Sequence, residues 1–149
     1  MKRAAYIIIV IVALAIGAYV FMNVWHSKPP RPMITADGKH VKAEQGTYCW
    51  AGFIKGECVD MISPPEIIAE HSTKPVKVSP GAEVKIEFAY KPDKHTLGAN
   101  QWINRNESEG VSVHDNVFKI PKEKGVYIYD VHAAWDEGSS SYVFVIEVE

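Results

Sequence analysis

An uninterrupted apolar run near the N-terminus constrains this chain more than any other feature. Residues 4–25 carry no charged side chain and follow the cationic start Lys2-Arg3. At about 1.5 Å per residue, a helix of this length reaches roughly 33 Å, enough to cross a hydrocarbon core of about 30 Å. A helix in a soluble core has a polar face, and this run has none. The sequence therefore predicts a transmembrane signal-anchor helix over residues 4–25 and a short cytoplasmic tail over residues 1–3.

A cleaved signal peptide is the alternative to an anchor. Ala13-Leu14-Ala15 has the small-x-small spacing of a cleavage site, but seven more apolar residues follow it. We expect an uncleaved single-pass anchor that contacts the lipid bilayer through residues 4–25 and holds the C-terminal domain outside the cytoplasm. Cleavage would instead give a secreted domain.

The next segment has the composition of a tether. Its motif Lys28-Pro29-Pro30-Arg31-Pro32 favours extended polyproline geometry and resists helix. We therefore predict a proline-containing tether over residues 26–45 and one folded domain over residues 46–149.

Within that domain the hydrophobic period is two, which is typical of half-buried β-strands. Hydrophobic side chains alternate with polar ones over residues 83–90, and the same pattern recurs over residues 126–135 and 141–149. Shorter candidate strands cover residues 47–50, 57–60, 76–78, 100–103, 111–113 and 116–120, and one helical turn is expected over residues 65–70. Many short strands separated by turn signals predict an all-β fold, an antiparallel β-sandwich of about seven strands.

The second half of the chain resembles an immunoglobulin-like module. Tyr127 matches the tyrosine-corner position, and Tyr129 stands where antibody domains have a core cysteine. Phe88 matches the partner position, and Trp102 matches the core tryptophan. The resemblance covers residues 80–149 and implies that these four side chains form the core. The chain departs from antibody domains because no disulfide joins the two sheets. It most resembles small bacterial modules of this kind that are membrane-anchored or secreted.

Cys49 and Cys58 are the only cysteines, and we expect them to form a disulfide outside the cytoplasm. The aromatic residues Tyr48, Trp50 and Phe53 cluster around this loop. Two interpretations stay open: a small core that closes one end of the sandwich, or an exposed anchor for a protein partner.

The remaining patterns argue against a cofactor, a metal or nucleic acid. The net charge of −2 gives no basic footprint for nucleic acid. No nucleotide-binding or nucleophile-elbow motif occurs. The last Cys and Met lie too early for a blue-copper site, although His114 and His132 each lie beside or near an aspartate.

The sequence therefore predicts a non-catalytic, single-pass membrane protein that presents an extracytoplasmic binding or regulatory module to an envelope protein. One alternative is an inhibitor of an envelope enzyme that acts through the Cys49–Cys58 loop. A second alternative is an extracytoplasmic metal-binding module.

Overall fold

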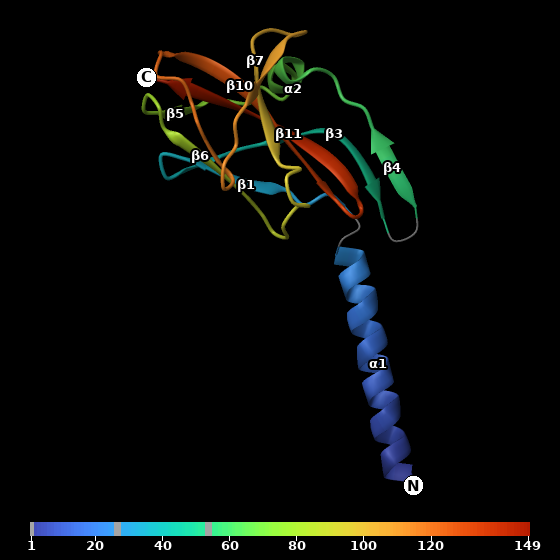
Figure 1. The fold of residues 1–149 in the computed structure, drawn as a ribbon. Coiled ribbons are helices and arrows are strands. Elements are labelled where there is room, and N and C mark those ends of the chain that lie inside the picture. The colour runs from blue at the N-terminus through green and yellow to red at the C-terminus, as the bar shows by residue number, and fades with distance from the viewer. Residues whose placement is uncertain (1, 26–27, 53–54) are drawn as a thin grey trace.

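The protein consists of a β-sandwich and one long N-terminal helix (Figure 1). The structure is a computed structural model that describes residues 2–25, 28–52 and 55–149, with side chains of the long helix described at residue 3 and residues 5–21. The elements are α1 (Lys2–Trp25), β1 (Pro32–Ala36), β2 (Lys39–Val41), β3 (Glu44–Ala51), β4 (Gly56–Val59), α2 (Pro64–Glu70), β5 (Val76–Val78), β6 (Glu83–Phe88), β7 (Gly98–Trp102), β8 (Ser108–Val111), β9 (Val117–Lys119), β10 (Gly125–Trp135) and β11 (Gly138–Val148).

Two sheets form the sandwich, and the predicted β-sandwich is confirmed at this level. The smaller sheet has the order β2-β1-β6-β9, and the larger has the order β4-β3-β11-β10-β7-β8. All of these pairs are antiparallel. β5 adds the one parallel pair among the described strands, alongside the second half of β11.

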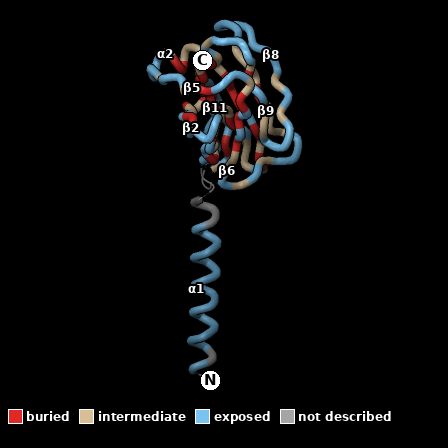
Figure 2. Tube along the Cα trace, turned by 90° about the vertical axis from the view of Figure 1, so that its left-hand side faces the viewer, coloured by how far each residue is buried: buried red, intermediate tan, exposed pale blue. Residues whose placement is uncertain are grey.

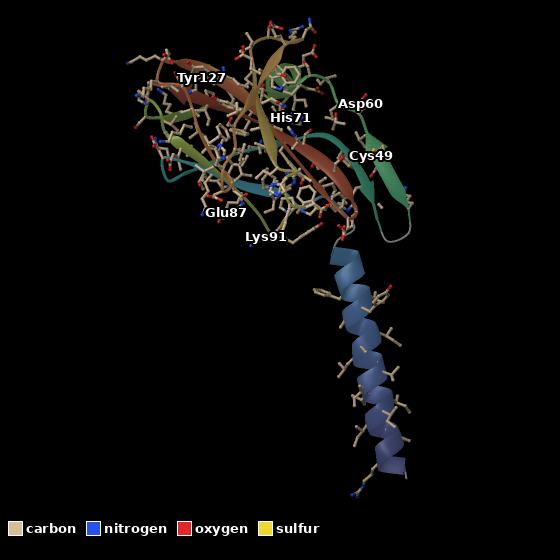
Figure 3. All side chains as sticks on the ribbon, viewed as in Figure 1. Cys49, Asp60, His71, Glu87, Lys91 and Tyr127 are labelled. Carbon is tan, nitrogen blue, oxygen red and sulfur yellow. A yellow bond between two sulfur atoms is a disulfide. The ribbon has the colours of Figure 1, made fainter. Side chains whose placement is uncertain are left out.

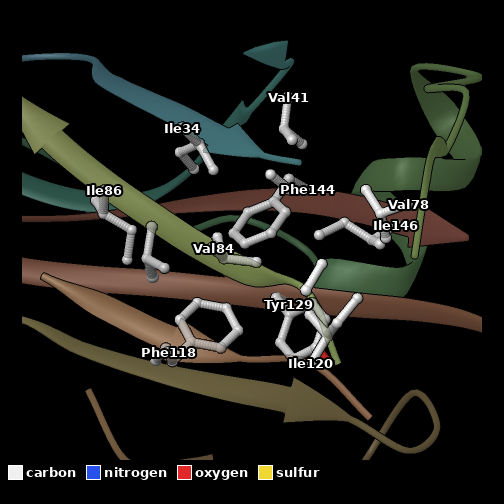
Figure 4. Close-up of a cluster of buried hydrophobic side chains, with 14 of the residues drawn as sticks. Ile34, Val41, Val78, Val84, Ile86, Phe118, Ile120, Tyr129, Phe144 and Ile146 are labelled. Carbon is white, nitrogen blue, oxygen red and sulfur yellow. The ribbon is translucent and has the colours of Figure 1, made fainter. Parts of the chain in front are cut away.

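The core lies between the sheets because the strands alternate apolar and polar side chains. Val84 and Ile86 of the smaller sheet meet Tyr129 and Phe144 of the larger sheet, and all four are almost fully buried (Figure 4). The inward faces predicted for residues 126–135 and 141–149 are thus confirmed.

The short helix α2 forms a third layer on the outer face of the larger sheet. Its Ile67 and Ile68 pack on Val143 and Val145, which point away from the sandwich core. Buried residues therefore occur beneath α2 as well as between the sheets (Figure 2). The helix predicted over residues 65–70 is confirmed, one residue longer at its start.

The tether predicted over residues 26–45 is wrong from Pro32 onward. Residues 32–36 pair with β6, and Ile34 is fully buried in the core. The hydroxyl of Tyr142 donates to the Pro30 carbonyl at 2.8 Å, which ties the preceding segment to the sandwich as well. The strand was not predicted because β1 begins at Pro32, the last proline of the motif, and is only five residues long.

The four expected core positions have different outcomes. Tyr129 is buried, and Phe88 and Tyr127 pack against the core from its margin. The Tyr127 hydroxyl donates to the Glu123 carbonyl at 2.9 Å. Trp102 is not in the core: it pairs with Ile128, whose side chain packs with α2 on the outer face. The core prediction for Trp102 is therefore wrong, because β7 has the opposite phase to the one expected.

The long helix α1 covers the predicted residues 4–25 and stands clear of the sandwich (Figures 1 and 2). Its large apolar side chains between Tyr6 and Phe21 are between 43% and 71% exposed. Over the residues that the structure describes, no helix combines the length and the apolarity needed to cross a membrane. The helix is thus observed, while its membrane-spanning role stays a prediction.

The β10–β11 turn generates the first testable prediction. Gly138 has φ of +149°, and a Cβ there would overlap the carbonyl oxygen of Cys49 on the neighbouring strand. We expect Gly138→Ala to lower the free energy of unfolding by about 2–4 kcal/mol, measured by urea denaturation. Gly110→Ala is the matched control, because a Cβ at Gly110 meets only open space. Equal urea midpoints for the two variants would contradict the turn geometry.

Candidate ligand-binding groove

The helix α2 covers part of the outer face of the larger sheet, and two open cavities beside it form a groove. One cavity of about 320 Å³ lies beside α2. A second of about 350 Å³ lies over the neighbouring part of β3, β10 and β11. Thr47 and Ser141 line both cavities, so the two form one continuous surface. Its size is within the range of about 300–1,000 Å³ typical of small-molecule sites.

The register of three strands brings the polar side chains of the groove together. Asp130 of β10 lies opposite Asn100 of β7, and His132 of β10 lies opposite Ser141 of β11. Asp130 and His132 alternate with the buried residues Tyr129, Val131 and Ala133, so they point to the outer face.

Asp130 is the centre of a hydrogen-bond network on the groove floor. Its Oδ1 accepts a hydrogen bond from Trp102 Nε1 at 2.6 Å and one from Asn100 Nδ2 at 3.2 Å. Its Oδ2 has two longer contacts of 3.4 Å, one from Asn100 Nδ2 and one with His132 Nδ1. The side chain of Asp130 is only 9% exposed, so the network holds a buried carboxylate at a fixed position.

The imidazole of His132 lies over Gly98 of β7. A Cβ at Gly98 would overlap His132 Nε2, so glycine leaves the space that the ring occupies. One ring nitrogen thus faces Asp130 and the other faces the backbone of β7. The Nδ1 atom of His132 thus contacts the carboxylate of Asp130. Among the described hydrogen bonds, none joins its Nε2 atom to a serine or threonine hydroxyl.

The segment that leads into α2 forms one wall of the groove. Thr47 Oγ1 accepts a hydrogen bond from the Met61 backbone at 3.1 Å and donates to Asp60 Oδ1 at 3.3 Å. At the start of α2, both the hydroxyl and the backbone N–H of Ser63 donate to Glu66. These hydrogen bonds from Ser63 hold the pKa of the Glu66 carboxyl below its usual value.

Glu44 ties the far end of α2 to β3. Its carboxylate lies 2.8 Å from Lys42 Nζ, accepts a hydrogen bond from Thr73 Oγ1 at 2.7 Å, and lies 3.8 Å from His71 Nδ1. Burial acts to raise the pKa of Glu44, but the contacts with Lys42, Thr73 and His71 outweigh it and lower the pKa. Glu44 therefore favours its charged form and holds the helix against the sheet.

The predicted partner-binding residues have separate outcomes. Trp50 is 3% exposed and packs edge-on against Trp135, with ring centroids 5.6 Å apart. It forms part of a small core at one end of the sandwich, and Tyr48 packs at the margin of that core. The structure therefore contradicts an exposed partner contact at Trp50 and agrees with the closing core. Phe53 lies outside the described residues.

The predicted Cys49–Cys58 disulfide is confirmed. The two cysteines are directly opposite each other on β3 and β4, so the bond crosses the hairpin at the edge of the larger sheet. Both residues are exposed, and Cys49 also lines the second cavity of the groove. Figure 3 shows Cys49 on this hairpin at the edge of the molecule. The disulfide thus braces the hairpin beside the groove.

His114 and His132, the residues of the metal-binding alternative, line different cavities. In the described part of the chain no cluster of three or more His, Cys, Asp or Glu side chains is suited to hold a metal ion.

Sequence reasoning missed Asn100 and Trp102 as groove residues. The alternation of residues 126–135 already indicates that Asp130 and His132 share the outer face. No local signal shows which face of β7 carries Asn100 and Trp102, because that depends on the register between β7 and β10.

Comparisons with models of known protein families, with curated proteins and with solved structures give no match for this chain. Its function is therefore argued from the groove, the disulfide and the long helix.

The contacts of Glu44 generate the second prediction. Because its folded-state pKa is below the ordinary value of 4.5, its stabilisation is present above pH 4.5 and is lost as the pH falls through the folded-state pKa. We expect Glu44→Gln to lower the free energy of unfolding by about 1–3 kcal/mol at pH 7, and the difference from wild type to shrink as the pH falls below 4.5 towards 3. Urea denaturation at both pH values measures this.

Glu83→Gln is the control for Glu44→Gln. It removes the same charge from an exposed ion pair with Lys119, 3.6 Å long, and exposed pairs contribute little. If the difference in free energy of unfolding between Glu44→Gln and wild type were the same at pH 3 as at pH 7, the charge of Glu44 would not be what stabilises the contact.

Proposed function

We propose that this protein is a non-catalytic binding module with immunoglobulin-like topology, held at a membrane by α1 with its sandwich outside the cytoplasm. The observation that carries the binding role is the groove on the outer face of the larger sheet, beside α2. It combines a buried carboxylate, an indole and an amide with several hydroxyl-bearing side chains.

The strand order supports the immunoglobulin-like assignment. β11, β10, β7 and β8 follow one another in the larger sheet, as the last, penultimate, third and adjoining strands do in that fold. β6 and β9 pair in the opposite sheet. The hydrogen bond from Tyr127 to a carbonyl four residues upstream has the form of a tyrosine corner.

The arrangement of His132 favours binding over catalysis. A hydrolytic site needs a nucleophile within hydrogen-bond reach of a general base. Here Ser141 Oγ donates to the Thr47 carbonyl at 3.1 Å, and the ring of His132 extends over Gly98 on the opposite neighbouring strand. The groove therefore offers fixed polar contacts for a ligand in place of an activated nucleophile.

The exposed side chains of α1 support the membrane placement. A row of large apolar residues that is about half exposed or more needs a nonpolar environment. The apolar sequence continues on both sides of the described side chains, from Ala4 to Trp25. A structural disulfide at Cys49–Cys58 is typical of proteins outside the cytoplasm, which supports the proposed sidedness.

Membrane fractionation tests the anchor. We expect the full-length chain, expressed in bacterial cells, to remain in the membrane fraction after carbonate washing and to dissolve in detergent. Replacing Ile9, Val12 and Ile16 with Lys should move the chain to the soluble fraction, because each lysine costs about 2.5–3.5 kcal/mol at the centre of a membrane helix.

The control carries the same three charges on the sandwich surface. Met33→Lys, Ile103→Lys and Val126→Lys change residues that are about as exposed as those of α1, and this triple variant should stay in the membrane fraction. Unprocessed wild-type chain in the high-speed supernatant would contradict the anchor.

Thiol labelling tests the sidedness separately. In intact cells, Cys49 and Cys58 should react with a membrane-impermeant maleimide only after a reductant is added. Thiols that react without reductant, and only after lysis, would place the sandwich in the cytoplasm and contradict the proposal.

A further inference from the structure

The carboxylate of Asp130 is buried, and its hydrogen bonds come from Asn100 and Trp102 and not from a lysine or arginine. Its side chain is 9% exposed, and among the described residues its one ion-pair contact is with His132, at 3.4 Å. No described lysine or arginine nitrogen lies within the 4.0 Å that defines an ion pair. Buried carboxylates are normally paired with a cation. A positively charged ligand group beside Asp130 would therefore supply the partner that the protein lacks.

The two oxygens of Asp130 are unequally satisfied. Oδ1 accepts the short hydrogen bond from Trp102, whereas both contacts of Oδ2 are 3.4 Å long. Contacts of this length lie at the weak end of hydrogen-bond geometry. Oδ2 thus keeps capacity to accept a strong hydrogen bond from a ligand.

The cavity beside Asp130 has one apolar side and one hydroxyl-bearing side. Its apolar lining comes mainly from Met61, Ile62, Ile67 and Val143. Thr47, Ser63 and Ser141 supply hydroxyl oxygens to the same cavity. Of the described residues that line it, Asp130 alone has a carboxyl group, and none is a lysine, arginine or histidine.

We propose that this cavity binds a primary ammonium group on a short hydrocarbon chain, with Asp130 as its counter-ion. The ammonium donates to Asp130 Oδ2, the hydrocarbon chain lies along the Met61 and Ile62 side, and the Trp102 indole holds the carboxylate in place. The inference rests on the proposed binding function, whose ligand class it names. The ammonium has two possible sources, a lysine side chain of a partner protein or a free aliphatic amine.

Charge decides against the other ligand classes. An anion would be repelled by Asp130, with no lysine or arginine in the cavity lining to offset the repulsion. A neutral sugar would use the hydroxyls but would leave the buried charge uncompensated.

Two probes separate the sources of the ammonium. Nα-acetyl-lysine-methylamide represents a lysine in a peptide, and 1,5-diaminopentane represents a free amine. The full-length protein in neutral detergent micelles is titrated with each probe, and the indole N–H resonance of Trp102 reports binding because it donates to Asp130. The Nε-acetylated lysine derivative and maltose are the uncharged comparisons.

Asp130→Asn is the decisive variant, since asparagine keeps the shape and an oxygen for Trp102 but removes the charge. We expect it to weaken amine binding at least tenfold. Asp115→Asn is the matched control: it removes the same charge from an exposed carboxylate that lines neither cavity of the groove, and it should leave the affinity within about twofold.

A second variant keeps the test decisive if Asp130→Asn does not fold. Ile62 is 46% exposed at the rim, so Ile62→Lys is tolerated and places a tethered ammonium beside the cavity. It should weaken amine binding about tenfold by competition.

Tighter binding of one amine probe supports the proposal and assigns the source. Three results overturn it: neither amine binds, maltose binds more tightly than both amines, or each folded variant binds amine as well as wild type does. Because these titrations use detergent-dissolved protein, their failure is distinct from a failure of the membrane anchor.

Discussion

The structure depends on the long antiparallel pairing of β10 with β11. The two strands are each eleven residues long and stay in register from Gly125 opposite Val148 to Trp135 opposite Gly138. Their inner side chains, among them Tyr129 and Phe144, form the core of the sandwich. Because side chains alternate along a strand, the same hairpin also fixes the outer row that carries Asp130 and His132. One interaction therefore positions both the core and the groove.

The outer face of this hairpin is divided by chemistry. Near the end that holds Val143 and Val145 it is apolar, and α2 covers it with Ile67 and Ile68. Near the β10–β11 turn it is polar, and it is open. Asp130 lies opposite Val143, at the boundary between these two parts, and lines the cavity beside α2. The groove therefore lies beside the start of α2, where the apolar part of the outer face ends.

Much of the fold follows from hydrophobic alternation, and the errors have identifiable causes. The inner faces of β6, β10 and β11 were predictable because each strand alternates over at least six residues. β1 was missed because it is short and begins at the last proline of a proline-rich motif. Trp102 was assigned to the wrong face because β7 has no clear alternation of its own, and its phase is set by pairing with β10.

The groove was only partly predictable for the same physical reason. Asp130 and His132 share a face by simple alternation, but the donors that hold Asp130 come from β7, 28 and 30 positions away in sequence. The aromatic residues near the disulfide pointed to the wrong surface, since Trp50 is used to close the core against Trp135. In this chain the side chain of Trp50 packs in the core. The candidate binding residues lie on the outer face of β7 and β10, which come together through pairing of strands distant in sequence. A buried carboxylate that the protein itself leaves short of a cation is therefore a better indication of a ligand site here than an aromatic cluster in a disulfide loop.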